Sequence, residues 1–268
     1  MGESSRLGGA EMAIAGLSGI GRTGLSLVRG MGQMTVFLVA AVGSLFRRPL
    51  RPVLLLRHLR VIGVTSTFVV LLTAAFTGMV LGLQLHYTLR KFGSEAVLGS
   101  AVGLSIIREL GPVLAALMVT ARAGSAITAE IGVMRITEQI DALEAMAIDS
   151  LQYLIAPRLL AGLLAMPLLV AIFDVVGILG GYAVGVHLLG GNEGSYWSSL
   201  EASVAWQDVS GGILKSISFG LIVSGVCCYK GYHTRSSAEG LGKATTEAVV
   251  LCAVLILAWD YFLTSVLL

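Results

Sequence analysis

The sequence carries little charge and little cysteine. Only 13% of its 268 residues are Asp, Glu, Lys or Arg, whereas a soluble domain averages about 25%. Its three cysteines fall in apolar runs without metal-ligand spacing, so neither a disulfide framework nor a metal site is indicated. In contrast, 56% of the residues are hydrophobic, and several runs reach the roughly 20 residues that a helix needs to cross a bilayer. These runs do not alternate as barrel strands do, so we predict an all-α integral membrane protein.

Catalytic motifs are also missing. Gly242-Lys243 is followed by Ala244, and Ser237 stands where a P-loop has its first glycine, so the chain lacks the loop that cradles nucleotide phosphates. Neither the G-x-S-x-G motif of serine hydrolases nor the H-E-x-x-H motif of zinc proteases occurs. We therefore expect a non-catalytic chain that itself binds no cofactor and no metal. No nucleic-acid partner is indicated either.

The hydrophobic runs divide the chain into a basic region, 1–60, and a region of five spans, 61–268. The spans are expected at about 61–84, 105–131, 155–189, 212–229 and 248–268. Within the basic region the run Met34–Leu45 is short, and runs of about 10–14 residues are more often interfacial than spanning. We interpret it as an interfacial helix with arginines on lipid headgroups, and a sixth span is the alternative.

Small residues at helical spacing indicate close helix packing. Gly78 and Gly82 form a G-x-x-x-G pair in the first span, a spacing that lets two helices approach closely. Gly177, Gly181 and Gly185 continue a similar stripe through the third hydrophobic region. That stripe favours one long, kinked helix over two short spans, although the region also contains a proline.

The distribution of basic residues predicts the orientation. Residues 1–60 contain eight arginines and two acids, and a second basic segment holds Lys230, Arg235 and Lys243. Residues 190–210 contain neither Lys nor Arg. Because basic loops stay in the cytoplasm, the N-terminus is expected to be cytoplasmic. Five spans then place the C-terminus on the outer side.

An amphipathic segment separates the second and third spans. Residues 134–149 are too polar for lipid, and their apolar side chains recur at helical spacing, which predicts a short helix at about 137–146. Thr137 is the expected cap. One face holds Ile136, Ile140, Leu143 and Ala147, and the other holds Glu138, Asp141 and Glu144. The helix is either a solvated connector or a surface for another protein.

Charged residues inside spans are costly and usually functional. Those expected here are Arg108, Glu109, Arg122, Glu130, Asp174 and Asp260. Arg108 and Glu109 are expected near the outer end of span two, as a headgroup-level pair or a ligand site. Asp174 or Asp260 is expected to pair with Arg122, and a proton relay is the alternative. Gln84 and Tyr87 provide polar groups beside an apolar helix surface. That surface either packs against another helix or lines a hydrophobic pocket.

These residues together resemble a known family. Three stretches, namely Arg108-Glu109-Leu110-Gly111-Pro112-Val113-Leu114, Ala121-Arg122-Ala123-Gly124-Ser125-Ala126-Ile127 and 130–144, are similar to the signature of MlaE-type permeases. Such permeases are membrane subunits of ABC transporters that move phospholipid between the two membranes of a Gram-negative envelope and maintain outer-membrane lipid asymmetry. The likeness is greatest over 105–158. Ala147 and Ser150 depart from it, where Gly and Pro are expected.

The resemblance implies a homodimer in the bacterial inner membrane. Its coupling helix would dock on a cytoplasmic ABC ATPase that holds ATP and Mg and carries a STAS-domain subunit. A hexameric MCE-domain ring would cap the outer side, and a soluble periplasmic carrier would exchange phospholipid with it. The coupling helix would comprise Thr137, Glu138, Gln139, Ile140, Asp141, Ala142, Leu143 and Glu144. An outward-facing lipid cavity at the dimer centre would be lined by Gly78, Leu81, Gln84, Leu85, Tyr87, Glu109 and Leu110.

Two other classes of function fit the composition. An ion-coupled secondary transporter or channel would use Asp174, Asp260 and Glu109 as a proton path and would work without an ATPase. A scaffold or membrane enzyme would need no energised partner at all.

Overall fold

The computed structural model describes residues 28–45, 52–235 and 237–267. The chain divides into two compact units, Met1–Ala40 and Ala41–Leu268. Residues 28–45 form one helix, which begins six residues before the apolar run Met34–Leu45. By length and composition this helix could cross a membrane, so the interfacial and the spanning interpretations both stand.

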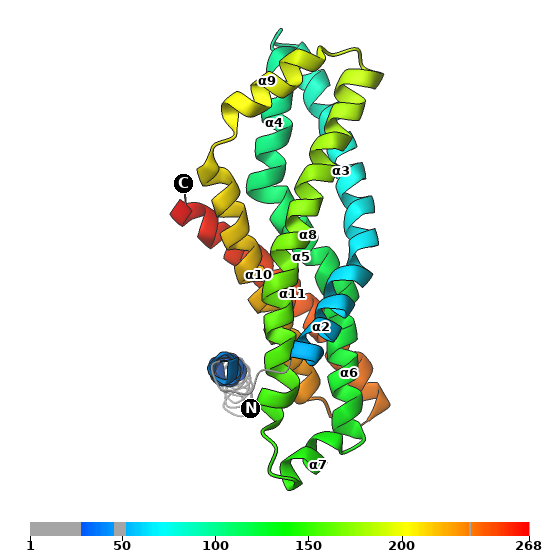
Figure 1. The fold of residues 1–268 in the computed structure, drawn as a ribbon, viewed down its shortest axis with the longest axis vertical. Coiled ribbons are helices and arrows are strands. Elements are labelled where there is room, and N and C mark those ends of the chain that lie inside the picture. The colour runs from blue at the N-terminus through cyan, green and yellow to red at the C-terminus, as the bar shows by residue number, and fades with distance from the viewer. Residues whose placement is uncertain (1–27, 46–51, 236, 268) are drawn as a thin grey trace, which may run out of the picture. The chain divides into compact units, whose positions relative to one another are not determined.

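In the part of the chain that the structure describes, the second unit contains helices joined by short turns and no strands, as the composition predicts (Figure 1). Short π-helical turns (η) join several α-helices into longer rods. In chain order the elements are α2 (Pro52–Leu59), η1 (Arg60–Val64), α3 (Thr65–Arg90), the 3-10 turn η2 (Glu95–Val97), α4 (Leu98–Ser105), η3 (Ile106–Leu110), α5 (Gly111–Val119), η4 (Thr120–Gly124), α6 (Ser125–Ile136), α7 (Gln139–Ala145), η5 (Leu151–Ile155), α8 (Ala156–Tyr182), η6 (Ala183–Leu188), α9 (Glu193–Ser203), α10 (Trp206–Tyr232) and α11 (Ala238–Leu267).

Five of these rods are long and apolar enough to cross a membrane, and each contains or overlaps one predicted span. Each rod begins before the predicted span, because the helix continues through the residues that precede the hydrophobic run. The third hydrophobic region forms a single rod, 151–188, with Pro167 inside it. With the helix at residues 28–45, the described part of the chain holds six candidate spans.

Glycines bring α3 and α8 into backbone contact. Gly78 lies against Gly177, and a Cβ on Gly82 would stand 2.8 Å from the carbonyl oxygen of Gly181. Any larger side chain at these positions would push the two helices apart. The glycine spacing in the sequence therefore correctly indicates a close helix contact, with α8 as the partner of α3.

The polar segments lie at opposite ends of this unit. Helix α7 is at one end (Figure 1). There the Tyr232 hydroxyl, at the end of α10, donates to Glu144 Oε1 over 2.9 Å. Helix α9 is at the other end, packed on α4 through a 3.3 Å hydrogen bond from the Ser100 amide to Ser199 Oγ. The basic segment after α10 thus shares an end with α7, as the charge distribution predicts.

The amphipathic helix differs from its prediction at its first turn. Thr137 does not cap it, because the Thr137 hydroxyl donates to the Val133 carbonyl one turn back. The chain turns instead at Glu138, whose φ of 58° is left-handed, and α7 begins at Gln139. At the far end Ala147 also has a left-handed φ, 56°, a conformation that favours glycine. The facial pattern is confirmed at Ile140, which is fully buried, and at Asp141 and Glu144, which are exposed. It is wrong at Ala147, which is expected on the apolar face but is exposed beyond the end of α7.

Replacing Gly82 with leucine should destabilise the protein by about 1–3 kcal/mol, the usual cost of overpacking. The added side chain would meet the backbone of Gly181 and separate α3 from α8. The measurement is the thermal unfolding midpoint of the purified chain in detergent. Gly242→Ala is the control, because nothing lies within 4 Å of that position. Equal midpoints for both variants would contradict the packing role.

Candidate functional site

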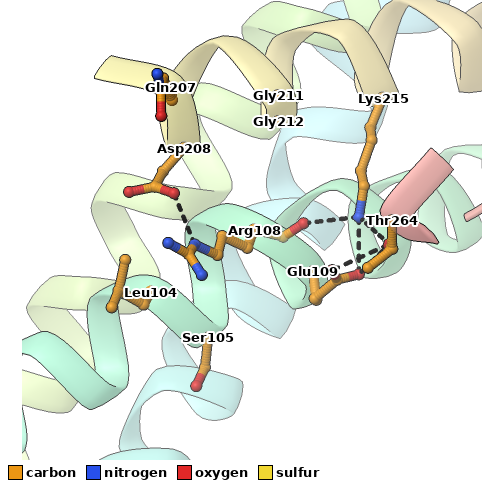
Figure 2. A pocket seen from close by; sticks show the side chains of 10 residues that line it. All are labelled: Leu104, Ser105, Arg108, Glu109, Gln207, Asp208, Gly211, Gly212, Lys215 and Thr264. Carbon is orange, nitrogen blue, oxygen red and sulfur yellow. Dashed lines mark hydrogen bonds and ion pairs between the residues drawn. The ribbon is translucent and has the colours of Figure 1, made fainter. Parts of the chain in front are cut away.

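A buried lysine organises a cluster of charged groups between three helices. Lys215, on α10, has a side chain only 3% exposed. Its ammonium donates to Glu109 Oε2 at 2.8 Å, to Thr264 Oγ1 at 2.7 Å and to the Arg108 carbonyl at 3.0 Å. The Asp260 carboxylate lies 3.0 Å from the same nitrogen. All three N–H donors of the lysine are therefore used, and η3, α10 and α11 are joined at one point (Figure 2).

The Arg108 carbonyl is available because of the proline four residues later. In an α-helix this carbonyl would accept from the amide of residue 112, but Pro112 has no N–H. The backbone widens into η3 at this point, and the Gly111 amide donates to the Ile106 carbonyl five residues back. Lys215 supplies a donor that Pro112 cannot. The Arg-Glu-Leu-Gly-Pro motif thus provides a free backbone carbonyl at Arg108 in addition to the charged side chains of Arg108 and Glu109.

A second ion pair holds the start of α10 to η3. Arg108 Nε lies 2.7 Å from Asp208 Oδ1, and the other Asp208 oxygen accepts from the Ala205 amide at 2.9 Å. Arg108 stays partly exposed, with 44% of its side chain accessible. Helix α10 is therefore fixed to η3 twice, at Asp208 and about two turns later at Lys215.

An open pocket of about 530 Å³ lies between these two ion pairs. Figure 2 shows its side chains, which come from α4, η3, α10 and α11. Its lining is Leu104, Ser105, Arg108, Glu109, Gln207, Asp208, Gly211, Gly212, Lys215 and Thr264. The lining combines charged groups with the apolar surface of the surrounding helices, which suits an amphipathic ligand with a polar head.

Most of the residues predicted to line a lipid cavity lie elsewhere on the chain. Only Glu109 belongs both to that prediction and to the pocket. Gly78 is buried against α8, Leu81, Leu85 and Leu110 are half-buried, and Gln84 and Tyr87 are exposed on α3. The predicted cavity involves a second protomer, so its lining remains a prediction.

The other intramembrane charges do not pair as expected. Asp260 pairs with Lys215 rather than with Arg122, which is exposed on η4 and forms no ion pair with a residue that the structure describes. Asp174 Oδ1 lies against Gly111 and has no hydrogen-bond partner among the described residues. Glu130 lies 3.1 Å from Nη2 of Arg158, a nearly buried cation on α8. The prediction of an ion pair with Arg122 is therefore wrong.

Sequence reasoning missed Lys215, Asp208, Thr264 and Arg158. Lys215 had a clear signal, since it is a cation inside an apolar run, and such residues are functional candidates by default. Thr264 and Asp208 had none, because a hydroxyl near a helix end or an acid in a first turn is ordinary. Within the described residues no group of three or more His, Cys, Asp or Glu side chains could hold a metal ion.

The predicted coupling helix lies at the far end of α10 from this pocket. Its exposed face presents Gln139, Asp141, Ala142 and Glu144. Two of its acids are already bound within the chain. Asp141 Oδ1 accepts from Arg135 Nη1 at 2.7 Å, and Glu144 Oε1 accepts from Ser150 and Tyr232.

Replacing Lys215 with leucine should cost about 3–5 kcal/mol of stability, because the carboxylates of Glu109 and Asp260 lose their counter-ion and the Arg108 carbonyl loses its donor. The measurement is the thermal unfolding midpoint in detergent. Lys230→Leu is the matched control, since Lys230 also pairs with one acid, Glu247, but with partly exposed side chains, where such a pair contributes less than about 1 kcal/mol. Equal losses in the two variants would contradict the central position of Lys215.

Comparison with known proteins agrees with this architecture. The family model described as Permease MlaE matches residues 55–266. A permease of Haemophilus influenzae named as part of an intermembrane phospholipid transport system is 41% identical over 96% of this chain and 98% of its own length. A probable ABC transporter permease of Rickettsia bellii is 43% identical over 92% of this chain and 95% of its own length.

A more distant relative is the chloroplastic protein Trigalactosyldiacylglycerol 1 of Arabidopsis thaliana, 34% identical over 78% of this chain and 60% of its own length. The family model covers η3, the Lys215 cluster and the amphipathic helix together. The chain belongs to the MlaE permease family.

Proposed function

We propose that this chain is the permease subunit of an ABC transporter that moves phospholipid between the inner and outer membranes. The observation that carries the proposal is its 41% identity, over almost its whole length, to a permease named for intermembrane phospholipid transport. The six candidate spans support a multi-pass protein of the bacterial inner membrane. The polar pocket between apolar helices suits an amphipathic cargo.

The energy comes from a separate ATPase in this proposal. The chain has no P-loop, so ATP and Mg²⁺ bind to the partner and the permease catalyses no reaction itself. Helix α7, with its exposed face around Asp141 and Ala142, docks on the ATPase. A STAS-domain subunit sits on that ATPase. In this proposal the helix at residues 28–45 lies in the membrane interface and the other five candidate spans cross the bilayer. The N-terminus and α7 are then cytoplasmic, and the C-terminus is periplasmic.

The lipid passage forms when two protomers associate. The exposed and half-buried residues Leu81, Gln84, Leu85, Tyr87 and Leu110 then line an outward-facing cavity together with Glu109. A hexameric MCE-domain protein and a soluble periplasmic carrier receive or deliver the lipid on the outer side. ATP binding moves the two coupling helices and favours the state with lower affinity for the lipid. Lipid release then follows from the difference in lipid affinity between the two states.

Co-reconstitution in vesicles with a fluorescent phospholipid tests the proposal. The chain with its ATPase should move lipid only when ATP is present, and the chain alone should move none. The ion-coupled alternative is favoured by Asp174 Oδ1, which lacks a hydrogen-bond partner among the residues that the structure describes. It predicts flux from the chain alone when a proton gradient is applied. Gradient-driven flux without the ATPase would overturn the proposal.

The substitution Ala142→Arg should abolish co-purification with the ATPase. Ala142 is exposed on α7, so a long cation there blocks a docking surface without disturbing the buried Ile140. The measurement is the amount of ATPase retained on the affinity-purified permease. Gly242→Arg, an exposed site on α11 with open space around it, is the control and should retain the partner. Full retention by Ala142→Arg would remove α7 from the interface.

A further inference from the structure

Helix α7 is tied to α10 by side chains as well as by its flanking segments. The Tyr232 hydroxyl donates to Glu144 Oε1 at 2.9 Å and lies 3.0 Å from Ser150 Oγ, which bonds to the same carboxylate oxygen at 3.1 Å. The three groups form a closed triangle. Because α7 and α10 are far apart in sequence, this triangle is a direct tertiary link between them.

The ring of Tyr232 is held in place from the other side. The guanidinium of Arg135 lies 5.8 Å from its centroid, within the range of a cation–π contact. Arg135 is itself bonded to Asp141 on α7. Both ends of α7 thus reach Tyr232, one through Asp141 and Arg135 and the other through Glu144. A displacement of α7 therefore acts on the end of α10.

Helix α10 is a continuous rod between two fixed points. It runs from Trp206 to Tyr232 without a proline or a π-helical turn, whereas η3 and η4 interrupt the rod that ends in α6, and α8 starts after η5. π-helical turns mark places where helix geometry changes. From Tyr232 to Lys215 is 17 residues, or about 25 Å at 1.5 Å per residue.

We propose that Tyr232 is a positioning residue that passes motion of α7 to α10, and that α10 passes this motion to the ionic cluster at Lys215. The inference rests on the proposed function, since it assumes that the ATPase moves α7. A shift of α10 would change the distances from Lys215 to Glu109 and Asp260, and so would alter the polar pocket. Nucleotide binding to the ATPase would then change the Lys215 cluster through α10, and not through the rods that contain π-helical turns.

The test uses the complete complex with its ATPase, reconstituted in vesicles with fluorescent phospholipid. Tyr232→Phe keeps the ring over Arg135 and removes only the hydroxyl. The complex should still assemble and hydrolyse ATP, but the lipid moved per ATP hydrolysed should fall about fivefold or more. Glu144→Ala breaks the same bond from the other side and should give a similar loss. The double variant should be no worse than either single one.

The matched control is Tyr261→Phe, which removes a hydroxyl from a ring that is 79% exposed on α11. It should leave the lipid moved per ATP unchanged. A stability effect alone would lower hydrolysis and transport together, so the ratio separates positioning from folding. An unchanged ratio in Tyr232→Phe, or a double variant with additive losses, would overturn the proposal.

A second measurement follows α10 directly. Ser210 is exposed near the start of α10 and does not line the pocket, so Ser210→Cys offers a thiol to a membrane-impermeant maleimide, while the three native thiols are buried. Its labelling rate should change severalfold when a non-hydrolysable ATP analogue binds, and Tyr232→Phe should remove that response. A response that persists in Tyr232→Phe would overturn the proposal.

If the parent complex moves no lipid with ATP, the proposed function fails first, and this inference with it.

Discussion

The hydrogen bonds and ion pairs of the Lys215 ammonium are the interactions on which the polar pocket and the helices around it depend. A charge buried among apolar helices is tolerated only when its donors are used and an opposite charge is close. Here the carboxylate of Glu109, the hydroxyl of Thr264 and the carbonyl of Arg108 accept hydrogen bonds, and the Asp260 carboxylate adds a second negative charge. These four groups come from η3 and α11. The requirement to satisfy one lysine therefore sets the relative positions of three helices. It also leaves a polar pocket beside them.

Glycine contacts and ion pairs hold the bundle together at different places. Helices α3 and α8 approach through glycines, so their contact consists of close backbone packing. Helix α10 meets α8 in the same way, because a Cβ on Gly220 would stand 2.7 Å from the carbonyl oxygen of Gly162. Ion pairs at Asp208 and Lys215 join α10 to η3 and α11 in addition. Ion pairs can change partners over small distances, whereas interlocked backbones resist sliding, so the ion pairs are the contacts that a small displacement of α10 would change first.

Patterns of single residues predicted much of the fold. Hydrophobic runs gave the five rods, the G-x-x-x-G pair indicated the contact at Gly82, and helical periodicity indicated that Ile140 is buried. The prediction failed where the outcome depended on a partner distant in sequence. Thr137 bonds back to Val133 because the chain turns at Glu138, and Asp260 pairs with Lys215 although Arg122 is an equally charged candidate. Lys215 itself was overlooked as an isolated charge in an apolar run.

The sequence by itself determined the class of protein, the number of long apolar segments and the family signature around Arg108, because composition and local periodicity are properties of the chain alone. Only the tertiary structure decided which carboxylates share Lys215, that this lysine replaces the N–H absent from Pro112, and that Tyr232 joins α7 to α10. The reason is physical. A buried charge or a hydroxyl takes whichever partner the packing brings within about 3 Å, and residues on different helices come that close only after the bundle has assembled.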